Sequence, residues 1–299
     1  MSRTLRIFEV HAFTTKVGGG NPAGVALDAA WMDEAGMQQF ATDRHIGDWA
    51  FALPPSTADA DLDVRFFSPR KELPFVGHAT LALHAVLSRS EPRPLRRQRG
   101  RNGIVEVRSL PEGAGFSISQ PAPPLGRPVD GDELREVLAL LGLSAAQLDA
   151  RCPPRIAGGA STRLLLGLAG PSVLDAVQPR LPELAALSAR LGAQGYFLFA
   201  VAGTAEQRIT EARMFCPAIG IDEDPVSGNA HAMLGVYLHA LGLLPVREGI
   251  AAFTGLQGRH VGRPGEVRVA VQLDGEGRPA SASIAGEAVI VSESELRLP

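Results

Sequence analysis

The 299-residue sequence has few cysteines and no long apolar run. Its two cysteines, Cys152 and Cys216, are too few for a disulfide framework and form no CxxC pair, so we expect both to be small buried side chains. No apolar stretch approaches the roughly 20 residues that cross a bilayer, and residues 1–13 lack the apolar core of a secretory signal. We therefore expect a soluble, cytoplasmic protein without a membrane partner.

The sequence also has no excess of basic charge. With 29 Lys and Arg against 32 Asp and Glu, its formal net charge is −3. A protein that holds nucleic acid by neutralising phosphates usually has a basic excess or a basic stripe. The arginine cluster at 93–101 is short and is interpreted as a solvated loop. We expect no nucleic-acid partner.

Motifs for metals and nucleotides are missing as well. The glycines at 18–20 precede Asn21 without a following GK[ST], and no GxGxxG follows a predicted strand. The histidines lack HExxH spacing, and the acidic triplet at 222–224 lacks the EF-hand pattern. The sequence therefore disfavours a resident metal or dinucleotide.

What the sequence does contain is an ordered internal repeat. The segment "ELPFVGHATLAL" at 72–83 aligns without a gap with "EDPVSGNAHAML" at 223–234. Four further pairs follow the same order: 5–13 with 162–170, 37–53 with 184–200, 65–69 with 213–217, and 103–109 with 265–271. Because single matches can be chance but an ordered series is not, the pattern predicts a duplication.

The repeat predicts two domains. Residues 120–133 are rich in Pro and Gly, which predicts a linker and gives domains of 1–122 and 123–299. A last strand near 286–299 can join the first domain. Each half has mostly strand patterns and one helix that is apolar on every face, and such a helix must be enclosed. We expect an α+β fold of two pseudo-symmetric domains, each a sheet or barrel around a central helix.

The two repeated helix starts predict a site. A helix N-terminus exposes unpaired N–H groups and partial positive charge, and the glycines Gly77 and Gly228 let a ligand approach the backbone. If the two starts face each other, a small acidic substrate fits in the interdomain cleft.

The copies differ where proton transfer needs asymmetry. The first has His78 where the second has Asn229, and Asp48 where the second has Gly195. Asp48 and His78 can form an acid–base pair, and Asp224 can hold the imidazole or balance the charge. Each also has a plainer interpretation: Asp48 as a turn residue, His78 as a polar residue at a helix start, and Asp224 before proline as a helix-start signal.

These motifs resemble the PhzF-like family, named for the phenazine-biosynthesis isomerase, which has the diaminopimelate epimerase fold. The resemblance covers nearly the whole chain. The matching segments are "GGNPAGV" (19–25), "IGDWAFALPP" (46–55), "FFSPRKELPFVGHATLALHAVL" (66–87), "EDPVSGNA" (223–230) and "QGRHVGRPGEV" (257–267). The resemblance implies a homodimeric isomerase without metal or organic cofactor.

In the family isomerase a glutamate moves the proton, assisted by a histidine, an aspartate and a serine. The resemblance assigns His78 and Asp224 to two of these roles, but Asp48 stands at the glutamate position and Asn229 at the serine position. Aspartate is one methylene shorter, about 1 Å, and such a displacement can cost ~10²-fold in rate. We also expect Trp49 to narrow the pocket beside Asp48. The residues assigned to substrate binding are Asn21, Gly77, Ser227, Gly228 and Asn229.

Two alternatives follow from the same positions. The two-thiol racemases of this fold have a cysteine at each helix start, where this chain has Val76 and Ser227, so the sequence disfavours that mechanism. The other alternative is a protein that binds a small acid without turnover. We favour an enzyme that moves a proton at carbon in a small carboxylate-bearing substrate, with Asp48 as the general acid/base; the sequence does not name that substrate.

Overall fold

The computed structural model describes residues 3–204 and 207–298. The chain forms two compact units, 1–119 with 285–299 (unit 1) and 120–284 (unit 2). The boundary expected after residue 122 thus lies three residues from the division. The last strand belongs to unit 1, where it pairs antiparallel with the first strand along the full length of both.

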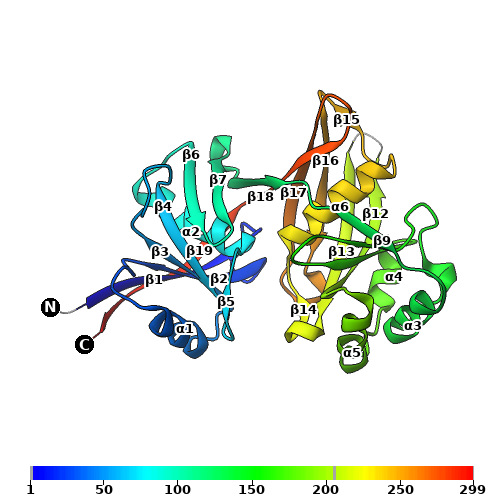
Figure 1. Ribbon diagram of the computed structural model, residues 1–299, viewed down its shortest axis with the longest axis horizontal. Coiled ribbons are helices and arrows are strands. Elements are labelled where there is room, and N and C mark those ends of the chain that lie inside the picture. The colour runs from blue at the N-terminus through cyan, green and yellow to red at the C-terminus, as the bar shows by residue number, and fades with distance from the viewer. Residues whose placement is uncertain (1–2, 205–206, 299) are drawn as a thin grey trace. The chain divides into compact units, whose positions relative to one another are not determined.

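Unit 1 is a strongly bent sheet with two helices (Figure 1). Its elements are β1 (Arg3–Ala12), β2 (Asn21–Leu27), α1 (Glu34–Asp43), β3 (Asp48–Leu53), β4 (Leu62–Phe67), β5 (Glu72–Leu73), α2 (Gly77–Ser90), β6 (Leu95–Gly100), β7 (Gly103–Ser109), β8 (Phe116–Pro121, which runs past the division) and β19 (Ala288–Leu298). Helix α2 packs against β1, β2, β3 and β19 and buries seven of its 14 residues, so the apolar helix is enclosed as its composition requires. Helix α1 is amphipathic, is capped by Asp33, and covers an aromatic cluster on the outer face of β3.

Unit 2 has the same kind of architecture with additional helices. Its elements are β9 (Leu125–Pro128), α3 (Gly131–Leu141), β10 (Arg155–Ala157), β11 (Arg163–Leu168), α4 (Pro171–Ala176), α5 (Leu181–Leu191), β12 (Gly195–Gly203), β13 (Arg208–Cys216), β14 (Ile221–Asp224), α6 (Gly228–Ala240), β15 (Val246–Arg247), β16 (Ile250–Gln257), β17 (Gly265–Leu273) and β18 (Pro279–Gly286, which runs past the division into unit 1). Helix α6 packs on β16 and β17, and Gly235 allows the close approach because a Cβ there would lie 2.9 Å from Val269.

The strand pairings follow one order in both units. In unit 1, β2 and β3 are parallel, β3 and β4 antiparallel, and β4 and β6 parallel. In unit 2 the strands β11, β12, β13 and β16 pair in the same order of parallel, antiparallel and parallel. Trp49 opposes Phe67 as Tyr196 opposes Phe215. The match of 5–13 with 162–170 was wrong, because the strand that occupies the place of β11 is β2, not β1.

Candidate functional site

In unit 1 the structure brings two of the predicted site residues together. Asp48 is the first residue of β3 and His78 the second residue of α2. The Oδ2 atom of Asp48 lies 3.8 Å from Nε2 of His78, and the two side chains are 24% and 15% exposed. This separation is too long for a hydrogen bond but lets both groups reach the same small molecule. Gly47, at φ +117°, makes the turn that precedes Asp48.

The His78 side chain is electrically neutral at physiological pH. Desolvation by burial lowers its pKa to about 4, because the protonated imidazole loses its hydration. At pH 7 the ring therefore has one N–H donor and one acceptor nitrogen. Beside a carboxylate, such a ring can donate a hydrogen bond or exchange a proton without needing to lose a positive charge first.

A buried polar network fixes the start of α2. The Thr80 hydroxyl donates to the Val76 carbonyl at 2.9 Å and accepts from Nε2 of Gln98 at 3.1 Å. The Oε1 atom of Gln98 in turn lies 3.0 Å from Nε2 of His84. Since these side chains are buried and hydrogen-bonded, the first turn, with Gly77 and His78, is held firmly to β6.

Asn21 lies at the start of the neighbouring parallel strand. It is the first residue of β2, is 7% exposed, and precedes Ala23, which is paired with Asp48. Because β2 and β3 run parallel, Asn21 and Asp48 lie at the same edge of the sheet.

The other predicted site residues lie in unit 2, around the start of α6. Ser227 caps this helix, with Oγ accepting from the Ala230 N–H at 3.3 Å; Gly228 and Asn229 are the first two helical residues. Asp224 ends β14. These four residues thus lie where β14 leads into α6.

Sequence reasoning missed Gln257, which positions that segment. Its Nε2 donates to the Asp224 carbonyl at 2.6 Å and its Oε1 accepts from the Ser227 N–H at 3.1 Å. Gln257 is 3% exposed. The signal available in the sequence was its place at the start of the motif "QGRHVGRPGEV".

The packing explains why only one unit has the carboxylate. Gly195 occupies in β12 the place that Asp48 occupies in β3, and a Cβ on Gly195 would lie 2.3 Å from Sγ of Cys216. The matching residue in unit 1 is the smaller Ser68, whose hydroxyl accepts from the Lys71 N–H at 3.1 Å. Unit 2 therefore has no room for a side chain at this position.

The expectation for Trp49 was wrong. The Trp49 ring is fully buried, makes an edge-to-face contact with Phe40 at 4.9 Å between centroids, and covers Gly24, where a Cβ would lie 2.2 Å from the ring. Successive side chains of a strand point to opposite faces, so Trp49 points away from the side of Asp48. It packs in the core cluster with Phe51 and Phe67 and does not narrow the space beside Asp48.

The interpretation of residues 93–101 as a loop was also wrong. Residues 95–100 form β6, in which Arg96 and Gln98 are buried and their neighbours are more exposed.

Both cysteines are free and buried, and burial raises the pKa of each thiol to about 12, so the prediction of small buried side chains is confirmed. Across residues 3–204 and 207–298, no cluster of three or more His, Cys, Asp or Glu side chains could hold a metal ion.

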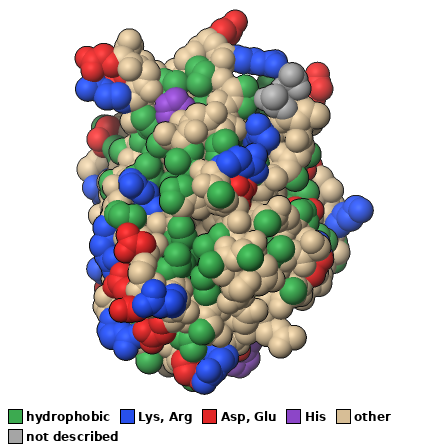
Figure 2. Space-filling view, turned by 90° about the vertical axis from the view of Figure 1, so that its right-hand side faces the viewer, with side chains coloured by type: hydrophobic (Ala, Val, Ile, Leu, Met, Phe, Trp, Pro, Cys, Tyr) green, Lys and Arg blue, Asp and Glu red, His purple; other side chains and the backbone are tan. Residues whose placement is uncertain are grey.

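The described surface has no long basic stripe on the face of the protein drawn in Figure 2, where acidic and basic side chains alternate along one edge. Within the described part of the chain, no helix is both long and apolar enough to span a bilayer.

The fold defines a class: mixed α/β proteins that share their fold with isomerases and epimerases. A hydroxyproline epimerase from Agrobacterium vitis, solved with bound trans-4-hydroxy-L-proline, has this fold, with a TM-score of 0.62 and 15% identity over 99% of this chain and 93% of that one. A Bacillus anthracis phenazine biosynthesis protein of the PhzF family is more similar, with a TM-score of 0.86 and 25% identity over 99% of both chains.

The sequence comparisons give the family. The PhzC-PhzF family, described as phenazine biosynthesis-like protein, matches residues 10–294, and the chain belongs to this family. An uncharacterized isomerase of Clostridium acetobutylicum is 33% identical over the full length of both chains. The trans-2,3-dihydro-3-hydroxyanthranilate isomerase of Pseudomonas aeruginosa is 28% identical over 98% of this chain and 99% of its own. The expected family resemblance is confirmed.

Proposed function

We propose that the protein is a cofactor-independent isomerase that moves a proton at carbon in a small carboxylate-bearing substrate. The observation that carries this proposal is the position of Asp48 beside a neutral His78 at the start of an enclosed helix. Relatives of the same length are named isomerases, which supports the reaction class.

In the proposed reaction Asp48 removes a proton from one carbon and returns it to another position of the same molecule. His78, being neutral, donates a hydrogen bond to the oxygen on which negative charge develops, or relays the proton. An isomerisation of this kind consumes no reductant or oxidant, because the proton lost from one atom is regained at another.

The start of α6 is proposed to bind a carboxylate. Its helix N-terminus supplies partial positive charge, Asn229 supplies an amide N–H, and Ser227 and Gly228 bring the backbone close. Asp224 is proposed to set the orientation or protonation of the group it meets. Asn21 and Gly77 are the proposed binding residues in unit 1.

We infer that the two units derive from one duplicated sequence, which the common order of strand pairings supports. We also propose that the protein acts as a homodimer; light scattering on the eluting protein should give twice the mass of one chain, and a single-chain mass would contradict this.

The substrate is proposed to differ from that of the Pseudomonas aeruginosa relative. An aspartate at the position where the family has glutamate withdraws the carboxylate by about 1 Å, enough to cost ~10²-fold in rate on a substrate that fits glutamate. The Asp48→Glu variant should therefore gain activity on trans-2,3-dihydro-3-hydroxyanthranilate relative to the native chain.

Deuterium incorporation from D₂O into candidate small acids, followed by NMR, tests the reaction. We expect exchange with the native protein, at least ~10²-fold less with Asp48→Asn, and unchanged exchange with Asp43→Asn, which removes an exposed carboxylate at the end of α1. Asn229→Ala should weaken substrate binding more than it slows exchange of bound substrate.

Two outcomes would contradict the proposal. Exchange by Asp48→Asn at the native rate would remove Asp48 from the reaction. Saturable binding of a candidate acid, with no exchange of any candidate by the native chain, would favour the alternative of a small-acid-binding protein without turnover.

A further inference from the structure

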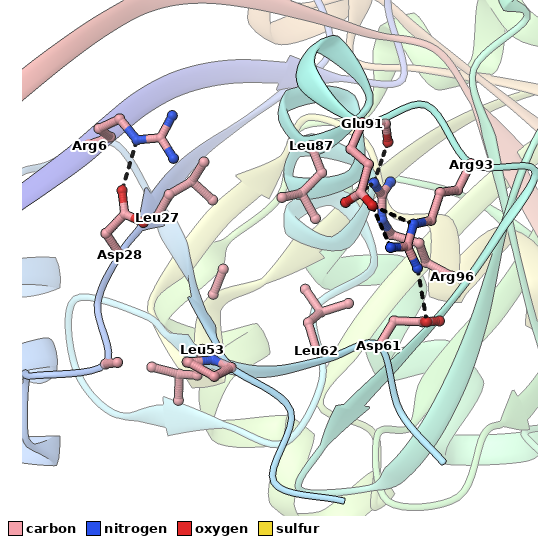
Figure 3. Close-up of a pocket in the computed structure, with 13 residues that line it drawn as sticks. Arg6, Leu27, Asp28, Leu53, Asp61, Leu62, Leu87, Glu91, Arg93 and Arg96 are labelled. Carbon is pink, nitrogen blue, oxygen red and sulfur yellow. Dashed lines mark hydrogen bonds and ion pairs between the residues drawn. The ribbon is translucent and has the colours of Figure 1, made fainter. Parts of the chain in front are cut away.

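Unit 1 contains a cavity that the proposed reaction does not use. It has a volume of about 470 Å³ and is lined by residues that include Arg6, Asp28, Leu53, Leu62, Glu91 and Arg96 (Figure 3). Cavities of a few hundred Å³ match small-molecule ligands. We call it the Arg96 cavity.

The Arg96 cavity lies at the opposite end of α2 from the Asp48–His78 pair. Leu87 and Glu91, at the C-terminal end of α2, line it, whereas His78 is in the first turn. A helix of 14 residues is about 20 Å long at about 1.5 Å per residue. A ligand here would thus be separate from the proposed reaction.

The lining of this cavity includes the largely buried guanidinium of Arg96. Its side chain is only 5% exposed, and its Nη2 donates to the carbonyl and the carboxylate of Glu91. Arginine has five N–H donors. Among the described residues, no acceptor bonds to Nε or Nη1 of Arg96, and both atoms keep some solvent-accessible surface. A largely buried guanidinium therefore offers free donors where it lines the cavity.

The other two arginines of the lining differ from Arg96, because Arg93 is bonded through all three of its guanidinium nitrogens and Arg6, bonded through Nε, is 46% exposed to solvent. Arg93 donates to Glu91 and, at 3.2 Å, to Asp61; Arg6 donates to Asp28 at 2.8 Å. Figure 3 shows these two charged groups on opposite sides, with Leu27, Leu53, Leu62 and Leu87 between them. The centre of the cavity is consequently apolar.

The charges select the kind of anion. The lining has three arginines and three acidic residues, Asp28, Asp61 and Glu91, so its formal charges balance. A dianion such as phosphate would meet these carboxylates without enough compensating charge, whereas a monoanion needs only the free donors of Arg96.

We propose that the Arg96 cavity binds a compact monocarboxylate with an apolar body. The carboxylate accepts from Nε and Nη1 of Arg96, and the body packs against the leucines. Charge-assisted hydrogen bonds from a poorly solvated guanidinium give the affinity, and the apolar surface gives the selection by shape.

Methyl NMR of leucine-labelled full-length protein tests this site, with cyclohexanecarboxylate as the probe and cyclohexanecarboxamide as the uncharged control. The carboxylate should shift the methyl signals of Leu53, Leu62 and Leu87 in a saturable way. The amide should bind at least about tenfold more weakly, because it cannot form the charged pair.

Three variants make the test specific. Arg96→Gln should weaken carboxylate binding about tenfold or more, whereas Arg93→Gln, which removes an engaged arginine of the same rim, should change it by less than about threefold. Ala30→Trp fills the cavity from an exposed position and should abolish binding even if Arg96→Gln does not fold. Deuterium exchange by Ala30→Trp should match the native rate, which separates this site from the proposed reaction.

Equal binding of the amide and the carboxylate would overturn the proposal. So would native affinity in Ala30→Trp, or probe-induced shifts confined to leucines outside the cavity.

Discussion

An arginine–glutamate pair with the same geometry precedes the helix start in each unit, and its loss should cost the two units different amounts. Arg65 donates to the two carboxylate oxygens of Glu72 at 2.8 and 2.7 Å, and Arg213 to those of Glu223 at 3.0 and 2.8 Å. Each guanidinium also lies over a phenylalanine two residues further along. The difference lies in the remaining partners.

Glu72 has a second arginine, Arg101, which still neutralises it when Arg65 is removed. In contrast, Arg213→Met leaves Glu223, 13% exposed, as a poorly solvated carboxylate and also removes the donor to the carbonyls of Leu174 and Val177. Breaking a buried pair on one side costs about 3–5 kcal/mol, whereas the loss of Arg65, which leaves the equally buried Glu72 paired with Arg101, should cost about 1–2 kcal/mol.

The two units can be followed separately. Both tryptophans, Trp31 and Trp49, are in unit 1, so urea unfolding detected by tryptophan fluorescence reports Arg65→Met. Hydrogen exchange of peptides from β13, β14 and α6 reports Arg213→Met. We expect about 3–5 kcal/mol less protection in unit 2, and partial recovery in Arg213→Met/Glu223→Met, which removes the unpaired charge. A larger loss for Arg65→Met, or unchanged exchange for Arg213→Met, would refute the reasoning.

Close packing at two glycines gives two further predictions, and a buried histidine gives a third. Gly24→Ala should cost about 1–3 kcal/mol in urea unfolding, because its Cβ would lie 2.2 Å from the Trp49 ring, and Trp49→Leu in the same chain should restore part of it. Gly255→Ala should cost a similar amount through its 2.0 Å approach to the His231 ring, with partial rescue by His231→Thr. Burial lowers the pKa of His84 to about 4, against about 6.5 in the unfolded chain, so the free energy of unfolding should fall as the pH drops from about 6.5 to 4. In His84→Gln the dependence of this free energy on pH should be smaller by about 1.4 kcal/mol per pH unit in that window. An unchanged pH dependence would contradict the prediction.

Much of the site segment could be predicted from the sequence because the two helix starts align without a gap. That alignment placed His78 and Asn229 at equivalent positions, and the separate match of 37–53 with 184–200 did the same for Asp48 and Gly195; the structure finds each pair at equivalent ends of helices or strands. The polar residues at a helix start are local features, so the sequence around them is enough to predict them.

What could not be predicted depends on contacts from distant segments. Arg96 is buried because its guanidinium reaches the end of α2, and nothing in the local run of arginines indicates that carbonyl. The orientation of Trp49 is different: it follows from strand alternation once Asp48 is placed on the open side, and so was available from the sequence.

The buried network shows how one packing problem is solved differently in the two units. In unit 1, Thr80 of α2 is small and Gln98 of β6 fills the space beside it. At the matching positions of unit 2, His231 of α6 is large and Gly255 of β16 leaves the space to it, with the ring bonding to the Ser227 carbonyl as Thr80 bonds to that of Val76. In unit 2 a large residue on the helix faces a small one on the strand, and in unit 1 a small residue on the helix faces a large one on the strand. The filled volume is therefore similar in both units, while the polar atoms differ.

Such paired changes alter the polar atoms behind each helix start. In unit 1 the helix start is backed by a network of three hydrogen-bonded side chains, whereas Nε2 of His231 has no hydrogen-bond partner among the described residues. The start of α6 is nevertheless held by Gln257, which bonds to the Asp224 carbonyl and the Ser227 N–H, and by the Ser227 cap, so both helix starts are fixed by buried side chains. The two units thus support their helix starts with different polar side chains, and Asp48 lies beside only the first of them.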